Sequence, residues 1–218
     1  MIDDRFTEAE LQKLEQVGPL RVYEPGQTIY FAGEPADSLY IIREGRVRVL
    51  LDALAGDEMT LEIVEKGRIF GESSFQSCST RPTTVIAINH VALIDCTIAT
   101  LLPYLQQDAE LLTKLLQFCS NTMNHLSYLL HDVCFLDRYG RVASLLLRET
   151  AQANPDKGIT ENCLPYTHEE IGWCLGLSRA TVSRVLQQFR CRGWIRSTYR
   201  KIEILNRGAL RNVISVGL

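Results

Sequence analysis

One stretch of the chain, residues 167–190, combines side chains that can bind nucleic acid with the spacing of a helix. Val182, Val185, Leu186 and Phe189 recur at helical intervals and define an apolar face. The opposite face has no acidic residue and consists of Arg179, Ala180, Ser183, Arg184 and Gln187. Guanidinium, hydroxyl and amide groups contact base edges and phosphates in protein–DNA complexes. We therefore predict a DNA-contacting helix, against the alternative of an ordinary amphipathic helix pair with a solvated charged face.

The residues before this helix predict a helix-turn-helix that would position it. Thr167 and Glu170 have the Thr-x-x-Glu spacing of a capping box at the start of a first helix. Gly176 stands where the turn between the helices needs the backbone freedom of glycine. Ser178 can then cap the second helix.

The flanking segments complete the pattern of a winged DNA-binding domain. Residues 137–151 predict a helix, and residues 154–164, rich in Pro, Gly, Asn and Asp, predict a loop. After the second helix, residues 194–205 (WIRSTYRKIEIL) have the pattern of a β-hairpin. Arg200 and Lys201 lie near the tip of this hairpin, so we expect both to contact DNA.

The chain has 218 residues, enough for two modest domains, and its net charge of −3 is unevenly distributed. Residues 138–218 contain 13 Lys and Arg against 6 Asp and Glu, a net of +7, which leaves −10 for residues 1–137. A basic part joined to an acidic part suits a nucleic-acid-binding domain attached to a second domain. The acidic first residues argue against a signal peptide, and no run of about 18 apolar residues occurs, so we predict a cytoplasmic protein without membrane contact.

Residues 22–98 consist of short apolar runs separated by turn residues, which predicts a compact antiparallel β-barrel or β-roll. The runs are QTIYF, SLYII, RVRVLL, TLEIV, TTVIAI and VALIDC. Before them, residues 7–17 predict a short helix that begins with a second capping box, formed by Thr7 and Glu10.

A helical region follows from about residue 98, with an interruption near residues 106–108. Residues 109–135 contain neither Gly nor Pro and predict one long helix. Its apolar residues recur at alternating spacings of 4 and 3, on Leu112, Leu116, Cys119, Met123, Leu126, Leu130 and Val133. We call these seven residues the seam. A heptad repeat of this kind favours a homodimeric coiled coil, and the alternative is a helix that lies on its own domain.

Other classes of protein are less favoured. The seven cysteines form no C-x-x-C pair, so we expect reduced, mostly buried thiols and no metal site. An enzyme would need a catalytic constellation, and the chain has no G-x-S-x-G, P-loop or H-E-x-x-H motif. The third alternative is a pure effector-binding or scaffold protein whose helix-turn-helix contacts protein rather than DNA, and the basic C-terminal part argues against it.

The chain resembles the CRP/FNR family of bacterial transcription regulators over about residues 10–210. The resemblance rests on EEIGWCLGLSRATVSRVL, on FLDRYGRVASLLL, and on the glycines of the β-like region at Gly33, Gly45, Gly56, Gly67 and Gly71, followed by Arg81. It implies an α+β fold with a jelly-roll-like antiparallel β-roll sensor at 1–108, a long dimerisation helix at 109–136 and a winged helix-turn-helix at 137–218.

The same resemblance implies how such a protein works. A homodimer would bind a palindromic site on double-stranded DNA and contact RNA polymerase, in activators often through the loop at 153–164. A small effector in the β-roll would shift the orientation of the DNA-binding domains, which would pivot near residues 135–137.

The resemblance also assigns roles in DNA binding residue by residue. Arg179 and Arg184 match base-reading positions, with Ser183 between them, whereas the positions that hold phosphates correspond to Thr167, His168 and Ser178. Ala180 stands where many relatives have Glu. Alanine cannot accept a hydrogen bond from cytosine, so contact with a thymine methyl group is expected instead.

In the sensor, the positions that bind a cyclic nucleotide in relatives correspond to Gly71, Glu72, Ser73 and Arg81. Pro82 departs from the pattern, because a hydroxyl residue is expected there, and Thr83 could replace it only in a shifted loop. On the long helix only Ser127 of the usual hydroxyl pair remains, beside Leu126. A cyclic nucleotide, another small effector and no effector all stay open. Haem bound by Cys78 and His90 is a less favoured alternative.

Overall fold

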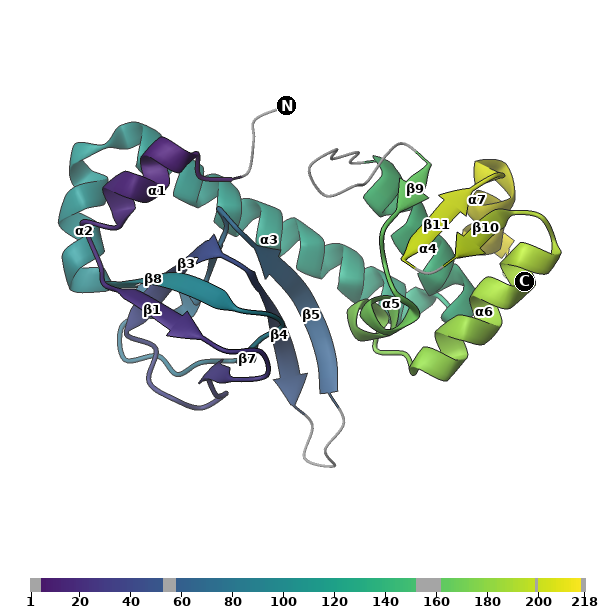
Figure 1. The fold of residues 1–218 in the computed structure, drawn as a ribbon, viewed down its shortest axis with the longest axis horizontal. Helices are drawn as coiled ribbons and strands as arrows, with labels where there is room; N and C mark the ends of the chain where they lie inside the picture. The colour runs from purple at the N-terminus through teal and green to yellow at the C-terminus, as the bar shows by residue number, and fades with distance from the viewer. Residues whose placement is uncertain (1–4, 53–57, 152–161, 199, 217–218) are drawn as a thin grey trace. The chain divides into compact units, whose positions relative to one another are not determined.

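A computed structural model describes residues 5–52, 58–151, 162–198 and 200–216. The chain forms two compact units, Met1–His125 and Leu126–Leu218. Each unit is described by itself, the first in purple to teal and the second in teal to yellow (Figure 1). No helix within the described ranges is long and apolar enough to cross a membrane.

The N-terminal unit contains two antiparallel sheets that together make the predicted β-roll (Figure 1). The first sheet has the order β1-β8-β3-β6 and the second β2-β7-β4-β5. The strands of the first sheet are β1 (Leu20–Tyr23), β3 (Ser38–Glu44), β6 (Ile69–Phe70) and β8 (Val91–Thr97). Those of the second are β2 (Thr28–Tyr30), β4 (Arg46–Asp52), β5 (Glu58–Glu65) and β7 (Thr84–Ala87). The six predicted runs are confirmed as strands; β1 and β6 were not separate predictions.

One apolar core of this unit draws on both sheets, and it includes Ile42, Val47, Phe70 and Val85. Gly45 makes the turn between β3 and β4 with a φ of 87°, and a Cβ there would lie 2.2 Å from the carbonyl oxygen of His90. Glycine is therefore required at this turn both by the backbone conformation and by the close approach of the backbone at the start of β8.

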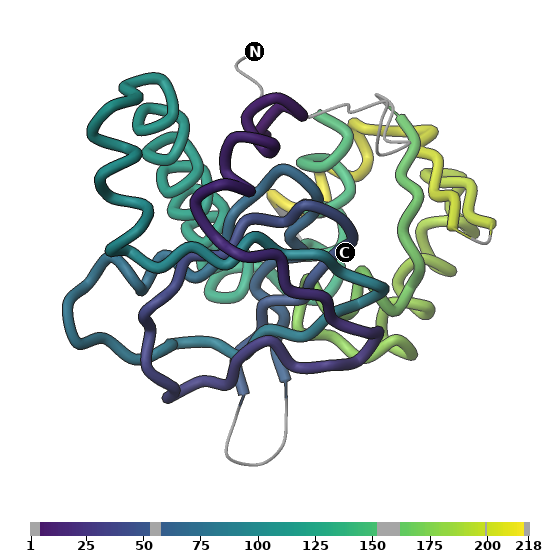
Figure 2. The backbone as a smooth tube through the Cα atoms, turned by 60° about the vertical axis from the view of Figure 1, so that its left-hand side comes forward, coloured from purple at the N-terminus to yellow at the C-terminus, as the bar shows by residue number. Residues whose placement is uncertain are grey.

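The N-terminal unit contains the helices α1 (Glu8–Leu14) and α2 (Ile98–Gln107), and α3 (Ala109–Phe135) belongs to it as far as His125. Asp108 has an extended backbone and separates α2 from α3, as predicted. The helix α1 lies beside α2 and the first half of α3 (Figure 1, Figure 2). A second apolar core joins these helices to β3 and β8; it includes Phe6, Leu11, Leu14, Ile41, Ile94, Leu101, Leu111 and Phe118.

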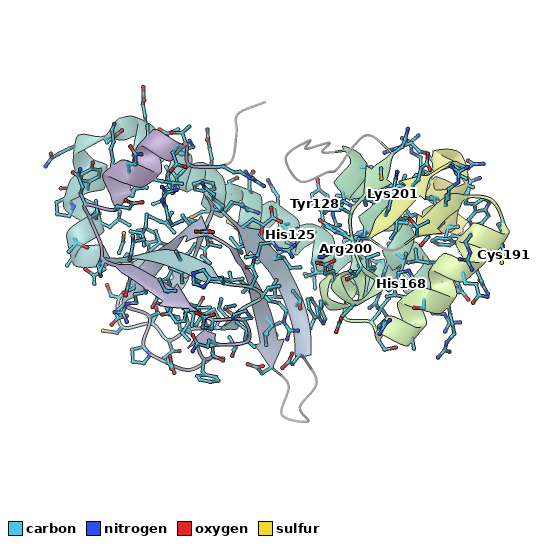
Figure 3. The ribbon with its side chains drawn as sticks, in the orientation of Figure 1. His125, Tyr128, His168, Cys191, Arg200 and Lys201 are labelled. Atoms are coloured by element: carbon cyan, nitrogen blue, oxygen red, sulfur yellow. The ribbon has the colours of Figure 1, made fainter. Side chains whose placement is uncertain are left out.

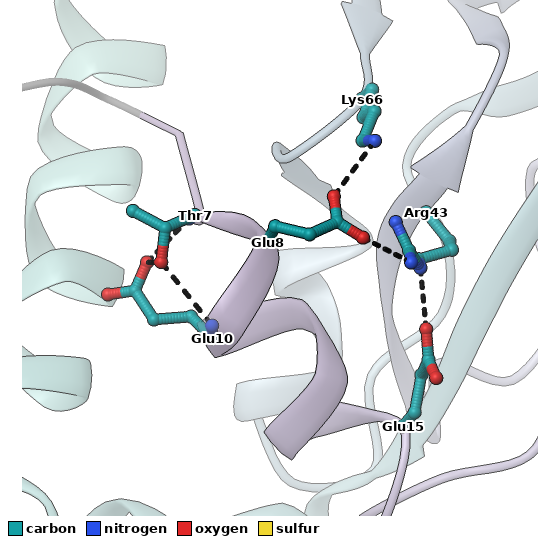
Figure 4. A network of polar contacts seen from close by, with 6 residues as sticks. All are labelled: Thr7, Glu8, Glu10, Glu15, Arg43 and Lys66. Carbon is teal, nitrogen blue, oxygen red and sulfur yellow. Dashed lines mark hydrogen bonds and ion pairs between the residues drawn. The ribbon is translucent and has the colours of Figure 1, made fainter.

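Charged side chains connect α1 to the β-roll at its exposed edge (Figure 4). Glu8 forms ion pairs with Arg43 and with Lys66, the latter at 3.0 Å. Glu10 completes the predicted capping box with Thr7 and also pairs with Lys114 of α3 at 2.7 Å. The short helix is thus held by buried leucines on one side and by ion pairs on the other.

The C-terminal unit contains the predicted helix-turn-helix and wing. Its helices are α4 (Arg138–Ala151), α5 (His168–Leu175), α6 (Arg179–Cys191) and α7 (Arg207–Val216). Its strands are β9 (Cys163–Leu164), β10 (Ile195–Thr198) and β11 (Lys201–Ile204), in the order β10-β11-β9. The helix α7 was not predicted.

Two sequence predictions need correction. The predicted loop at 154–164 does not continue to its end, because Leu164 is fully buried and pairs with Ile202 in strand β9. Residues 152–161 of that loop lie outside the described residues. The cysteines are all free, as expected, but they are not mostly buried. Only Cys96 is buried, whereas Cys78, Cys134 and Cys191 are exposed.

Candidate nucleic-acid interface and effector cassette

The start of α5 is fixed by the capping box that the sequence predicts. The Thr167 hydroxyl accepts a hydrogen bond from the Glu170 N–H at 3.1 Å, and the Glu170 carboxylate accepts one from the Thr167 N–H at 2.8 Å. At the other end Gly176 adopts a left-handed conformation with a φ of 61°. A Cβ on Gly172 would lie 2.6 Å from the carbonyl oxygen of Leu177. The turn therefore needs glycine at 172 as well, a requirement that the sequence alone did not reveal.

Helix α6 presents the face predicted to contact DNA. The Ser178 hydroxyl caps it by accepting from the Thr181 N–H at 3.1 Å. Val182, Val185, Leu186 and Phe189 are buried in the core of the unit. On the opposite face Arg179, Ala180, Arg184 and Gln187 are exposed and Ser183 is half-buried.

His168 and Ser183 are in direct contact, which was not predicted. The His168 Nδ1 atom lies 2.8 Å from the Ser183 hydroxyl and connects the start of α5 to the exposed face of α6. Burial lowers the pKa of His168, and the positive charges of Arg179 and Arg190 lower it further. Burial and these two arginines therefore favour the neutral form of the imidazole.

The wing is attached to the same helix start. Arg200, in the turn between β10 and β11, has a left-handed backbone with a φ of 50°. Its guanidinium forms an ion pair of 3.1 Å with Glu170, the residue that closes the capping box. Lys201 is exposed next to it at the beginning of β11 (Figure 3). The structure thus brings Thr167, Ser178, Arg179, Ser183, Arg184, Arg200 and Lys201 together within one folded unit.

The residues that the sequence predicts to bind an effector, Gly71, Glu72, Ser73, Arg81 and Thr83, begin at the end of β6, and we call them with the turn that contains them the cassette. Gly71 has a left-handed backbone, with a φ of 88°, and opens a short 3₁₀ helix, η1 (Glu72–Phe75). Arg81 is only 3% exposed. It donates hydrogen bonds to the carbonyl oxygens of Gly71 at 3.0 Å and Ser38 at 2.6 Å. Three of the predicted residues therefore meet, because Ser73 also lies 3.5 Å from the Arg81 guanidinium.

Aromatic rings cover the buried arginine. The guanidinium carbon of Arg81 lies 4.4 Å from the ring centroid of Tyr30 and 5.5 Å from that of Tyr40. Such cation–π contacts stabilise a cation that has left water. Burial raises the pKa of Tyr30 to about 12, although a hydrogen bond with Thr83 opposes the shift. Thr83 is therefore engaged by a tyrosine at the base of the cassette.

Glu72 and Ser74 are the polar groups of the cassette with unusual surroundings. Burial raises the pKa of Glu72, the charge of Glu62 adds to the shift and Arg68 opposes it. The hydroxyl of Ser74 is buried and has no hydrogen-bond partner among the described residues. Ser127, the remaining predicted effector residue, is exposed on α3 and belongs to the C-terminal unit rather than to the unit that contains the cassette.

Cys78 and His90, the residues considered for haem, are both exposed. The His90 ring lies 3.5 Å from the Glu24 carboxylate, and Cys78 has a left-handed backbone with a φ of 55°. Over the described part of the chain, no group of three or more His, Cys, Asp or Glu side chains could hold a metal ion.

Comparisons with known proteins agree with this architecture. The family model for the cyclic nucleotide-binding domain matches residues 20–108, and the model for the Crp-like helix-turn-helix domain matches residues 140–213. The CRP-like cAMP-activated global transcriptional regulator of Mycobacterium tuberculosis is 33% identical over 175 residues, which cover 78% of this chain and 77% of that protein. The chain belongs to the CRP/FNR family of transcription regulators.

Other CRP/FNR proteins extend the comparison. The cAMP-activated global transcriptional regulator Vfr of Pseudomonas aeruginosa is 30% identical over 80% of this chain and 84% of its own length. The solved structure of a CooA mutant from Carboxydothermus hydrogenoformans matches with a TM-score of 0.79 at 21% identity, over 95% of this chain and 92% of that one. This last similarity concerns the fold. As a CRP/FNR protein, the chain is a transcription regulator with a DNA-binding helix-turn-helix domain and a domain of the cyclic nucleotide-binding type.

Proposed function

We propose that this CRP/FNR regulator binds a palindromic DNA site as a homodimer, under the control of a small effector held in the β-roll. The observation that carries the proposal is the α6 surface, where two exposed arginines and a serine lie opposite a fully buried apolar face. The sensor at 1–108, the dimerisation helix at 109–136 and the DNA-binding part at 137–218 are the divisions that this proposal uses.

Each polar group of the α5–α6 surface has a role in the proposal. Arg179 and Arg184 read bases, because an arginine fork matches the O6 and N7 acceptors of guanine. Ala180 contacts a thymine methyl group. Thr167, His168 and Ser178 lie at helix starts, where a phosphate is favoured, and Lys201 and Arg200 extend the contact from the wing.

The exposure of the α3 seam supports a homodimer. Leu116, Met123 and Leu130 are 62%, 69% and 64% exposed in the single chain. On another face of the same helix Leu111, Leu115 and Phe118 are buried in the N-terminal unit. The long helix therefore serves its own unit with one face and leaves the heptad face for a second copy. A two-fold axis would place the two recognition helices about 34 Å apart, in successive major grooves.

The buried arginine of the cassette supports the proposal that the effector is an anion. Arg81 is a cation in an apolar setting, and the unpartnered hydroxyl of Ser74 lies in the neighbouring turn. The relatives from M. tuberculosis and P. aeruginosa are named as cAMP-activated, so cAMP is the first effector to test. A cyclic phosphate would have to displace the Ser38 and Gly71 carbonyls from Arg81, and Pro82 offers it no N–H donor. The effector would act by shifting the population of two orientations of the DNA-binding domain.

Besides DNA and a second copy of the chain, membership of the CRP/FNR family suggests one further partner. RNA polymerase is the partner we expect, through the loop at 153–164, of which the structure describes residues 162–164. The relatives are transcription regulators and not enzymes.

Band-shift selection from a random DNA library tests the proposal, with and without added cAMP. We expect a palindromic site whose half-sites are about 10 base pairs apart. Mass spectrometry and an absorbance spectrum of the purified protein would identify a bound nucleotide or haem. Absence of any sequence-specific complex with every effector tried contradicts the proposal.

Arg184→Ala tests the assignment of the readout face. The substitution should cost about 1–3 kcal/mol of binding free energy at one base pair and relax specificity there. Arg211→Ala is the control, because Arg211 is an exposed arginine on α7 of the same unit. Loss of affinity that is uniform across all sequences would instead make Arg184 a phosphate contact.

A further inference from the structure

His168 contacts Ser183, whose hydroxyl belongs to the face of α6 that we propose reads DNA. Ser183 lies between Arg179 and Arg184 in the chain, and its oxygen is 2.8 Å from the His168 Nδ1 atom. A serine hydroxyl has a single proton to donate and two lone pairs to accept with. Whichever role His168 takes in this hydrogen bond therefore decides which role remains for DNA.

We propose that His168 determines whether Ser183 presents a hydrogen-bond acceptor or a donor to the DNA, and thereby which base pair Ser183 selects. This inference rests on the proposed function, because it requires that the α6 surface reads bases. It makes His168 a positioning residue that acts through Ser183.

The two states differ in where the hydroxyl proton points. When the Nδ1 atom of a neutral His168 accepts the Ser183 proton, only the serine lone pairs face outward. They can then accept from the amino group of adenine or cytosine. When Nδ1 carries a proton, it donates to the serine oxygen and the hydroxyl proton turns outward. That proton can then be donated to guanine O6 or N7, to thymine O4 or to adenine N7.

The surroundings of His168 favour a neutral imidazole at neutral pH, and the tautomer of that imidazole with its proton on Nε2 gives the first state. Burial and the charges of Arg179 and Arg190 on α6 all lower its pKa. On α5 itself, Glu170 is engaged by Thr167 and Arg200, and Glu169 is the other acid of the first turn. The helix α4 also packs against α5, and its charged side chains have partners elsewhere. Arg148 pairs with Asp132, Glu149 with Tyr166, Arg138 with Tyr139, and Arg141 with the carbonyls of Leu136 and Val133. The cations on α6 therefore dominate, and acidification is needed to charge the imidazole.

The test is a competition binding assay with DNA sites that carry each base pair in turn at the position read by Ser183. That position is the one at which Ser183→Ala removes the base preference. Wild-type protein is measured at pH 8 and at pH 5.5. We expect the preference for an amino-bearing base to shift toward guanine or thymine at pH 5.5. The relative affinities should change by between about twofold and tenfold, the range for one neutral hydrogen bond.

Two variants separate this mechanism from a general effect of pH. Ser183→Ala should show no change of base preference with pH. His168→Arg carries a donor at every pH, so its base preference should match that of the wild-type protein at pH 5.5 and be the same at pH 8. All comparisons are ratios within one protein, so changes in overall affinity cancel.

The inference is overturned if the wild-type preference at this position is the same at both pH values. It is also overturned if the shift with pH persists in Ser183→Ala. Failure of all variants and of the wild-type protein to form a sequence-specific complex is a different result, because it contradicts the proposed function itself.

Discussion

The guanidinium of Arg81 is held by two backbone carbonyl groups and by two tyrosine rings. A bound anion would have to change this arrangement. Carbonyl dipoles and aromatic faces compensate a buried cation without a full negative charge, so an anionic ligand would be a stronger partner. An anion that takes over these two hydrogen bonds of Arg81 would replace the carbonyl groups of Gly71, at the start of η1, and of Ser38 in β3.

Glu72 gives a prediction of pH-dependent stability. Burial raises its pKa above the usual 4.5, so the folded state binds this proton more tightly than the unfolded state. The stabilisation of the folded state by this protonation is fully present below pH 4.5, and it is lost as the pH rises through the folded-state pKa of Glu72. Glu72→Gln, which is neutral at every pH, should therefore raise the free energy of unfolding at pH 7–8. Below about pH 4 the variant and the wild-type protein should converge.

Urea unfolding followed by circular dichroism between pH 4 and pH 8 measures this difference. Glu34→Gln is the control because Glu34 is exposed, and it should have little effect at either end of the range. The free energies of unfolding of Glu72→Gln and the wild-type protein could differ by the same amount at every pH. In that case the ionisation of Glu72 would not be the cause of the difference.

Local patterns made some residues predictable and left others hidden. Thr167 and Glu170 were predictable because a capping box depends on four consecutive residues. Gly172 and the His168–Ser183 contact were not, because each depends on how closely two helices approach. The exposure of Cys78, Cys134 and Cys191 was also missed, since composition reports how often a residue type is buried and not where a given residue lies.

At the scale of the helix, the α5 capping box should stabilise the C-terminal unit measurably. Thr167→Ala removes the hydroxyl that accepts from the Glu170 N–H, and the expected loss is about 1 kcal/mol of unfolding free energy. Both tryptophans of the chain, Trp173 and Trp194, lie in this unit. Tryptophan fluorescence during urea unfolding therefore reports on it alone.

Thr7→Ala is a matched control, because Thr7 forms the same capping box with Glu10 in the N-terminal unit. It should leave the tryptophan transition where it is. If Thr7→Ala shifted that transition as much as Thr167→Ala, the two units would unfold together and the assignment of the loss to α5 would be wrong.

The end of α3 is held to α4 by a buried carboxylate, across the segment where the sequence predicts a pivot. Asp132 is 5% exposed and accepts from the Ser144 hydroxyl at 2.9 Å and from Arg148 at 3.1 Å. Asp132→Ala leaves Arg148 without this acceptor and should cost about 3 kcal/mol of unfolding free energy. Asp132→Asn keeps an acceptor for Ser144 and should cost less.

A double-mutant cycle with Arg148→Ala checks that the loss comes from this pair. The double variant should be destabilised by less than the two single losses added together. Strict additivity, measured by the same tryptophan fluorescence, would place the stabilisation in packing around the two side chains rather than in their contact.

At the scale of the whole molecule, the heptad pattern predicted more than the packing of one chain. The same helix supplies buried residues to its own unit and leaves Leu116, Met123 and Leu130 in solvent. The structure shows one face of the helix packed on its own unit, whereas a dimer along the seam stays a prediction. Periodicity could predict a seam because a heptad repeat lies along one helix, whereas the buried face depends on contacts with residues distant in the sequence.

Met123→Glu should weaken the homodimer. A dimer would bury two carboxylates without partners, and each costs several kcal/mol. The dissociation constant should therefore rise by about 100-fold or more, as measured by sedimentation equilibrium. Leu102→Glu is the control, because Leu102 is 46% exposed on α2 and is not part of the seam. Equal association of both variants and the wild-type protein would contradict a dimer along α3.

The ion pair between Arg200 and Glu170 affects how salt acts on DNA binding. Lysine and arginine side chains that neutralise phosphates release condensed counterions, and their number sets the slope of log K against log salt concentration. Arg200 is already paired with a carboxylate of its own unit. If Arg200 contacted a phosphate, it would exchange one anionic partner for another and leave the Glu170 Oε1 atom without its cation. Of the two cations at the tip of the wing, only Lys201 should therefore contribute to the salt dependence of DNA binding.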